Sequence, residues 1–206
     1  MTYSIVAIDP GRKYLGVACV SGSIAVGSRV PWARYPVGAV ATQAYTNPSL
    51  GNIILDLIER GYSAEKALLK ALNMDKAPDL RQVAVIDYNY GKAVHSGRNI
   101  PRKYSEYIGR YCICIANLVK DEHIPEAMCR VFEEYVKTTE FHVALYKALL
   151  EGHRLGGDKR GDRSAAILVV GRTEYGRYYD RLIDLRIDYA ENPLASMERL
   201  LGLLSL

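Results

Sequence analysis

The first part of the chain contains short, mainly apolar runs, a pattern typical of β-strands that are buried on both faces. Asp9-Pro10-Gly11 and Ser21-Gly22-Ser23 interrupt the pattern with turn-forming residues. Short connections of this kind favour antiparallel pairing between neighbouring strands. The predicted strands are Tyr3–Ile8, Leu15–Val20, Ile24–Val30 and Val37–Gln43.

Two later stretches of the chain have apolar residues spaced as in amphipathic helices. Further strands are predicted between and after these two stretches. The predicted helices are Ile53–Glu59, Ala64–Leu72, Pro125–Tyr135, Phe141–Leu150 and Pro193–Leu204. The later predicted strands are Gln82–Asp87, Lys92–His95, Tyr111–Ala116, Ser164–Val170 and Ile183–Ile187.

The order of these elements predicts an α+β fold. Strands, a helix pair, strands, a second helix pair and final strands can form two mainly antiparallel sheets packed between two helical layers, an αββα four-layer sandwich. No linker-like stretch divides the chain, and its 206 residues can form one core. We therefore expect a single domain over residues 1–206.

Charge and hydropathy narrow the set of partners. The 27 basic and 23 acidic residues give a formal charge of +4 and are interspersed along the chain, as expected of a solvated surface and not of a polyanion-binding stripe. Nucleic acid is therefore not an expected partner. No apolar run approaches the roughly 18 residues of a membrane-spanning helix, so no membrane association is expected either.

The cysteine and histidine spacings do not predict a metal site. Cys19, Cys112, Cys114 and Cys129 form no CxxC pair, and no two histidines lie three or four residues apart. We expect reduced, structural cysteines, a cytoplasmic protein, and no metal or cofactor.

The N-terminus offers a candidate nucleophile. Met1 precedes a small residue, the circumstance in which an initiator methionine is commonly removed, and its removal would give Thr2 a free α-amine. That amine, with an ordinary pKa of about 7.7–8.0, can accept the proton of the attacking Thr2 hydroxyl. The alternative is an ordinary strand-forming threonine.

The first hairpin brings a second hydroxyl to Thr2. If Asp9 and Tyr14 close the loop, Ile8 pairs with Leu15 and Thr2 pairs with Ser21. Ser4 then shares a face with Thr2 because side chains alternate along a strand.

Other candidate site residues lie at strand ends and in one glycine-rich loop. Gln43, Asn47 and Asn117 are suited to oxyanion stabilisation or to turn capping. The loop at residues 156–164 carries Asp158 and Arg160, and Arg160 could bind a substrate carboxylate through two hydrogen bonds. It could instead be an ordinary surface loop, or Arg160 could brace it by pairing with a nearby aspartate.

Nearly the whole chain resembles the domain of unknown function 1028 family, an uncharacterised family of the Ntn-hydrolase (N-terminal nucleophile) superfamily. The matching segments are Thr2–Ala7, Ala25–Ser28, Val30–Ala33, Val37–Ala44 with Asn47-Pro48, Asn117-Leu118, Gly156–Asp158, Arg160-Gly161, Ser164–Ala166 and Asp184–Arg186. The resemblance implies the αββα fold and strengthens the case for Thr2 as nucleophile.

These features predict an amidohydrolase acting on a small amide metabolite, with Thr2, Ser21 and Asn117 catalytic and Gln43, Asn47, Asp158 and Arg160 binding substrate. A ligand-binding or assembly protein that retains the fold without catalysis is the alternative. A hydrolase using Cys19 as nucleophile is weaker, because no base is predicted near it. The leucine-rich C-terminal segment favours a homo-oligomer.

Overall fold

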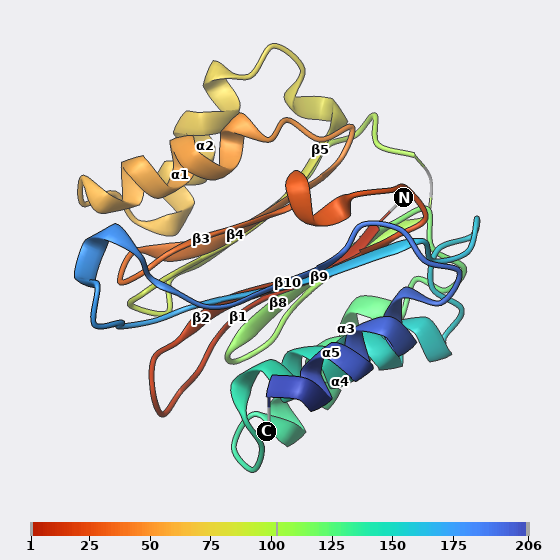
Figure 1. Cartoon of the computed structure of the whole chain (residues 1–206). Coiled ribbons are helices and arrows are strands. Elements are labelled where there is room, and N and C mark those ends of the chain that lie inside the picture. Colours follow the sequence, from red (N-terminus) through yellow and green to blue (C-terminus); the bar gives the residue numbers. More distant parts are fainter. Residues whose placement is uncertain (1, 102, 205–206) are drawn as a thin grey trace.

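The computed structural model describes residues 2–101 and 103–204, and in these residues the chain forms two antiparallel sheets and five α-helices. The elements stack as a helical layer, a four-stranded sheet, a six-stranded sheet and a second helical layer (Figure 1). None of the helices in the described part of the chain is both long and apolar enough to cross a membrane.

The six-stranded sheet has the order β10-β9-β2-β1-β8-β7, so the first strand of the chain lies near its centre. Each neighbouring pair is antiparallel. Its strands are β1 (Thr2–Ile8), β2 (Leu15–Ser21), β7 (Tyr104–Ile108), β8 (Cys112–Asn117), β9 (Ser164–Val170) and β10 (Arg181–Ile187).

The four-stranded sheet has the order β3-β4-β5-β6 and is also antiparallel. Helices α1 (Ser49–Glu59) and α2 (Ala64–Met74) cover its outer face. Its strands are β3 (Pro31–Arg34), β4 (Gly38–Ala44), β5 (Arg81–Asp87) and β6 (Lys92–Ser96).

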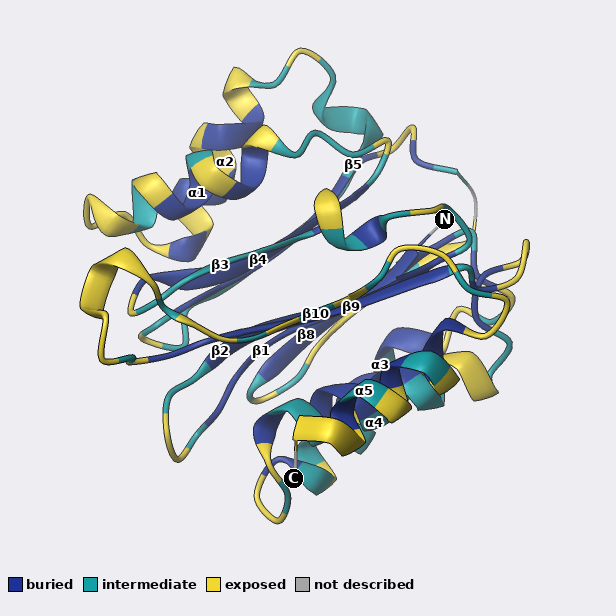
Figure 2. Ribbon diagram, viewed as in Figure 1, coloured by how far each residue is buried: buried dark blue, intermediate teal, exposed yellow. Residues whose placement is uncertain are grey.

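The outer face of the six-stranded sheet is covered by α3 (Ile124–Tyr135), α4 (Phe141–Arg154) and α5 (Pro193–Leu204). Apolar side chains fill all three interlayer spaces, because both faces of β1, β2, β8 and β9 are buried. Figure 2 shows these strands buried along their length, whereas the helices bury only the face toward the sheets.

The first hairpin has the predicted register: Ile8 pairs with Leu15 and Thr2 with Ser21. Its turn is held by Asp9, whose side chain accepts a hydrogen bond from the backbone N–H of Gly11 at 2.7 Å. Side chains alternate along a strand, so a one-residue slip would send every side chain to the opposite face. Both strands are fully buried, so such a slip would disturb the packing on both faces, and this fixes the register.

The predicted strand Ile24–Val30 is wrong. Ala25 takes a left-handed conformation with φ of 53°, and a short 3₁₀ helix follows at Val26–Ser28. The Ser164 hydroxyl accepts a hydrogen bond from the Val26 N–H, tying this segment to β9. The strands β3 and β7 were not predicted from the pattern, because they are edge strands with partly or largely exposed residues.

Candidate functional site

A polar cluster lies between the two sheets at the end where β1 begins and β2, β4 and β8 finish. Apolar residues fill the rest of this interlayer space, but here the inward side chains are hydroxyls and amides. The cluster contains Thr2, Ser4, Ser21, Gln43, Gln82 and Asn117, all buried.

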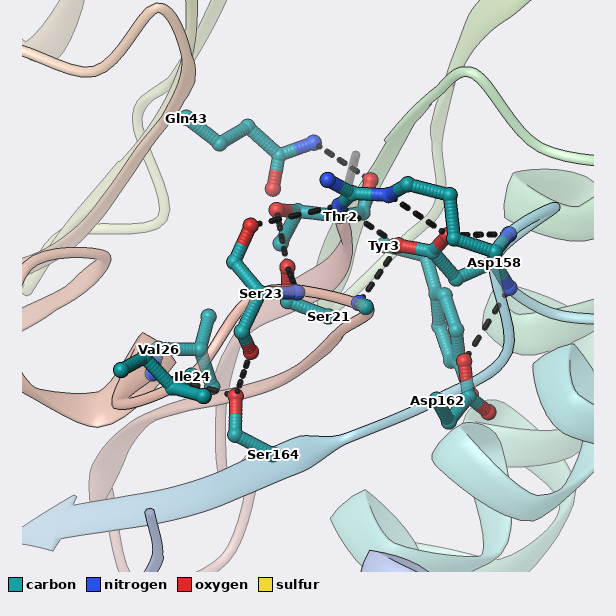
Figure 3. Close-up of polar contacts among 12 residues, drawn as sticks. Thr2, Tyr3, Ser21, Ser23, Ile24, Val26, Gln43, Asp158, Asp162 and Ser164 are labelled. Carbon is teal, nitrogen blue, oxygen red and sulfur yellow. Dashed lines mark hydrogen bonds and ion pairs between the residues drawn. The ribbon is translucent and has the colours of Figure 1, made fainter. Parts of the chain in front are cut away.

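Thr2 lies between two neighbouring strands that each present a polar side chain. In the register of the sheet it pairs with Ser21 of β2 on one side and with Asn117 of β8 on the other. The Thr2 hydroxyl donates a hydrogen bond to Ser21 Oγ at 3.2 Å (Figure 3). The central position of β1 therefore places this hydroxyl within a preformed polar environment.

Gln43 connects Thr2 to the opposite sheet. Its Nε2 donates hydrogen bonds to the Thr2 carbonyl at 3.2 Å and to Gln82 Oε1 at 2.8 Å. Its Oε1 accepts the Ser4 hydroxyl at 2.6 Å. The Gln43 side chain is thereby fixed and holds the backbone of Thr2 in place.

Gln82 continues this network to β8. It pairs with Gln43 in the register of β4 and β5, and its Oε1 accepts a hydrogen bond from Asn117 Nδ2 at 3.0 Å. Its own Nε2 donates to the Ala116 carbonyl at 3.1 Å. Gln82 was not predicted as a site residue, and the available signal was a glutamine at the start of an otherwise apolar predicted strand.

Asn117 has an unsatisfied acceptor. The residue is fully buried, and among the described residues its Oδ1 has no hydrogen-bond partner. A buried, unpartnered amide oxygen costs about 1–3 kcal/mol, and such groups are rare in folded proteins. The unsatisfied atom belongs to the residue that pairs with Thr2 in the neighbouring strand, but Asn117 itself does not line the cavity beside Thr2.

A small cavity opens beside Thr2, with a volume of about 90 Å³. Its lining is polar on the side of the first two strands and apolar near the 3₁₀ helix. Ser23, Arg29 and Thr46 are further polar residues of the lining that were not predicted. The cavity is lined by Thr2, Ser21, Ser23, Val26, Arg29, Val30, Gln43, Ala44 and Thr46.

The glycine-rich loop reaches the rim of this cavity. An Arg160 guanidinium nitrogen donates to Ser23 Oγ at 3.2 Å and to the Asp158 carboxylate at the same distance. Asp158 is buried and also accepts the backbone N–H groups of Gly22 and Arg160, at 2.5 and 2.8 Å. Arg160 therefore pairs with a nearby aspartate, Asp158, which is one of the arrangements considered from the sequence. Asp158 in turn holds the loop against the end of β2 (Figure 3).

A second aspartate fastens the other side of the loop. Asp162 accepts hydrogen bonds from the Tyr3 hydroxyl at 2.7 Å and from the backbone N–H of Asp158 at 3.1 Å. His153 Nδ1 also lies 2.7 Å from the same carboxylate. Burial, followed by the nearby Asp162 charge, raises the pKa of Tyr3 well above its usual value, so the phenol stays protonated as a donor.

Asn47 lies outside the cavity lining. Its side chain accepts the Ser49 N–H and hydroxyl at the start of α1, at 3.2 and 2.7 Å, and donates to Asp75 at 3.0 Å. Asn47 therefore caps the turn before α1, which is one of the two roles considered from the sequence. Cys19 is buried between the sheets, and desolvation raises the pKa of its thiol, which makes it a poor nucleophile.

The comparisons with known proteins identify a family without an assigned function. A family model described as a family of unknown function, DUF1028, matches residues 2–197. A crystal structure of a Silicibacter pomeroyi protein described with the same family superposes with a TM-score of 0.89 and 26% sequence identity, covering 100% of this chain and 86% of that one. No curated protein matches the chain. The chain therefore belongs to the family of unknown function DUF1028.

Proposed function

We propose that the protein is an N-terminal-nucleophile amidohydrolase with an Ntn-hydrolase-like αββα sandwich, acting on a small amide after removal of Met1. The observation that carries the proposal is the position of Thr2. It begins a central strand, contacts the Ser21 hydroxyl and lines the cavity between the two sheets. Met1 itself lies outside the described residues.

In the proposed reaction, Thr2 Oγ1 attacks the carbonyl carbon of the amide while its proton passes to the freed α-amine of Thr2. The amine then gives this proton to the leaving nitrogen as the C–N bond breaks. Water hydrolyses the resulting ester and restores the hydroxyl. Ser21 orients the nucleophile through the hydrogen bond that its Oγ accepts.

Asn117 is the proposed polar partner of the reacting groups. One of its N–H bonds is engaged by Gln82, which fixes the orientation of the amide. The other N–H can stabilise the developing oxyanion, and the unpartnered Oδ1 can accept a hydrogen bond from the α-amine. Such an arrangement would satisfy an atom that is otherwise buried without a partner.

The size of the cavity supports a small substrate. The cavity of about 90 Å³ is well below the size of most ligand sites, so the proposed substrate places only a small amide group in it. Arg160 at the rim is the proposed contact for a carboxylate or another acceptor on the rest of the substrate. The proposed partner is a small metabolite in the cytoplasm, where the four cysteines, none in a disulfide, would stay reduced.

A ligand-binding protein without catalysis remains the second candidate. The cavity is smaller than the roughly 300–1,000 Å³ of typical ligand sites, and the Arg160–Asp158 pair is already satisfied within the chain. Both observations count against ligand binding as the sole role of the cavity, so catalysis at Thr2 is the preferred proposal.

Two mass measurements test the proposal. Intact mass of the native protein should show the loss of Met1, and incubation with an electrophilic acylating probe should add one acyl group at Thr2. Thr2→Ser should retain labelling, and Thr2→Ala should abolish it.

Thr138→Ala, which removes an exposed hydroxyl far from the cavity, is the matched control and should label normally. Full retention of Met1, or equal labelling of Thr2→Ala and the native protein, would contradict the proposal. Protein that lacks Met1 and is labelled at Thr2 is then assayed with a panel of small amides to identify the substrate.

A further inference from the structure

Three of the four cysteines meet in the core on the far side of the six-stranded sheet. Cys112, Cys114 and Cys129 are all buried, and their sulfur atoms lie within 4.8 Å of one another. Cys129 Sγ lies 2.9 Å from Cys112 Sγ and 3.0 Å from Cys114 Sγ. The cluster stands apart from the Thr2 cavity, to which it contributes no lining residue.

Strand and helix periodicity together explain this convergence. Cys112 and Cys114 are two residues apart on β8, so both side chains face the helical layer, whereas Ile113 and Ile115 face the other sheet. Cys129 lies on the face of α3 that packs on β8. No local sequence spacing reveals the group, because its members come from two elements.

We propose that Cys112, Cys114 and Cys129 form a binding site for a soft, thiophilic metal ion, Cu(I), held by three sulfur ligands. Sulfur ligands select soft ions such as Cu(I) over the hard cations that prefer oxygen. A buried site also excludes the water molecules that hard cations retain.

The number of ligands favours Cu(I) over Zn(II), which prefers four. Glu133 Oε1 lies 4.0 Å from Cys112 Sγ, but it is not part of the group whose ligand atoms all lie within reach of one another. The same oxygen accepts the backbone N–H groups of Arg110 and Tyr111, which hold it away from the other two sulfurs. Within the described residues the site therefore offers three ligands.

The cysteines bind the ion as thiolates, so their protons pass to water as Cu(I) binds, and the sulfur atoms move only slightly. Three ligands at about 2.3 Å around a trigonal ion lie about 4.0 Å apart, so the two short sulfur separations open by about 1 Å. Small rotations about the cysteine χ1 torsions provide this change.

Gly109 packs closely on the cluster. A Cβ there would lie 3.0 Å from Cys112 Sγ and 2.5 Å from Glu133 Oε1, so the turn between β7 and β8 has no room for a side chain beside the cluster.

The test adds Cu(I) to the reduced full-length protein without oxygen, removes loosely held metal with a chromophoric Cu(I) chelator, and measures copper per chain after gel filtration. The native protein should retain one Cu(I) per chain. Cys114→Ala and Cys129→Ala should each weaken retention at least tenfold.

Cys19→Ala is the matched control, because it also removes a fully buried sulfur from a strand but lies on the opposite side of the sheet. It should retain copper as the native protein does. Circular dichroism checks folding, and Cys112→Ala replaces any cluster variant that does not fold.

Three results would overturn the proposal. The first is folded, reduced native protein that releases all its copper to the chelator. The second is equal loss of copper in Cys19→Ala and the cluster variants. The third is a native mass lower by two hydrogens with no copper retained, which would indicate a disulfide within the cluster.

Discussion

Asn117 is the residue of the site that has a buried acceptor atom without a hydrogen-bond partner among the described residues. Most buried polar atoms of the site are paired within the chain: Gln43 uses both its oxygen and its nitrogen, and Ser21 accepts from Thr2. Asn117 Oδ1 has no such partner among the described residues. Because the rest of the network fixes the amide, this oxygen cannot turn away without breaking the bond to Gln82.

Replacing Asn117 should therefore slow the reaction. Asn117→Ala removes the proposed oxyanion donor without burying a charge, and loss of one oxyanion donor costs roughly 10²–10³ in turnover. The rate of acylation at Thr2 should fall by this factor, measured by mass spectrometry over time, while circular dichroism stays unchanged. An acylation rate equal to that of the native protein would remove Asn117 from the mechanism.

Arg160 should contribute to stability as well as to the site. Arg160→Ala leaves the buried Asp158 carboxylate with only its backbone donors, and we expect a loss of about 1–3 kcal/mol in the free energy of unfolding. Arg160→Lys keeps the charge but not the two-point contact, so its loss should be smaller.

Thermal and urea unfolding of both Arg160 variants measure the effect. A change within about 0.5 kcal/mol in both variants would indicate an ordinary surface loop. Reduced acylation in a variant of native stability would instead point to direct contact between Arg160 and the substrate.

Among the elements, the helices, the buried strands and the edge strands β6 and β10 were predictable, whereas the short edge strands β3 and β7 were not. The β1–β2 hairpin, including the Thr2–Ser21 pair, follows from two adjacent apolar runs and from closure of the turn at Asp9 and Tyr14. By contrast, β7 is largely exposed and carries no alternating pattern. Its partner strand β8 is apolar on both faces, and its pairing with β1 over more than a hundred residues cannot be read from local sequence.

The same limit applies to the polar cluster and to the cysteines. Thr2 was a candidate because it follows Met1, and Ser21 because it pairs with Thr2 in the predicted hairpin. Gln43 and Asn117 were candidates as polar residues at strand ends, and the structure brings these residues together with Thr2. Gln82 joins them only through the register of β4 with β5, a long-range contact. Such groups of residues form where sheets and helices from distant parts of the chain pack together. No short sequence motif encodes that packing.

The connection between α2 and β5 depends on one buried ion pair. Asp75 ends α2 and accepts hydrogen bonds from Arg81 Nε at 2.8 Å, Asn47 Nδ2 at 3.0 Å and the Ala77 N–H at 2.9 Å. The Arg81 hydrogen bond is the main reason that the pKa of Asp75 lies well below its usual value. The charged form is therefore the one that the fold stabilises.

Asp75→Asn should lower the free energy of unfolding by about 1–3 kcal/mol at neutral pH. A depressed pKa contributes stability that is complete above the unfolded value of about 3.9 and is lost as the pH falls below it. The difference between the variant and the native protein should thus shrink between about pH 4 and the acid limit of folding. Urea unfolding at several pH values measures it, and a difference independent of pH would contradict the argument.

At the scale of the whole molecule, the C-terminal helix presents an apolar surface. Leu201 of α5 is buried in the core, but Leu203 and Leu204 are 59% and 51% exposed. Only part of the leucine-rich segment therefore packs within the chain. We propose that the exposed leucines contribute to a homo-oligomer.

Light scattering at micromolar concentration should give a mass above that of the monomer for the native protein and a lower mass for the double variant Leu203→Ser, Leu204→Ser. Leu69→Ser is the control, because Leu69 is equally exposed on the opposite helical layer. A native protein of monomer mass would contradict the proposal.

The central position of β1 has a consequence for the biosynthesis of the protein. The strand is enclosed on one side by β2, which follows at once, but on the other by β8, whose residues 112–117 leave the ribosome much later. In the finished fold Thr2 is buried. Before β8 is synthesised, one edge of β1 is open, and an aminopeptidase acting on the nascent chain would meet Met1 there. The timing of translation therefore bears on how the proposed nucleophile is made.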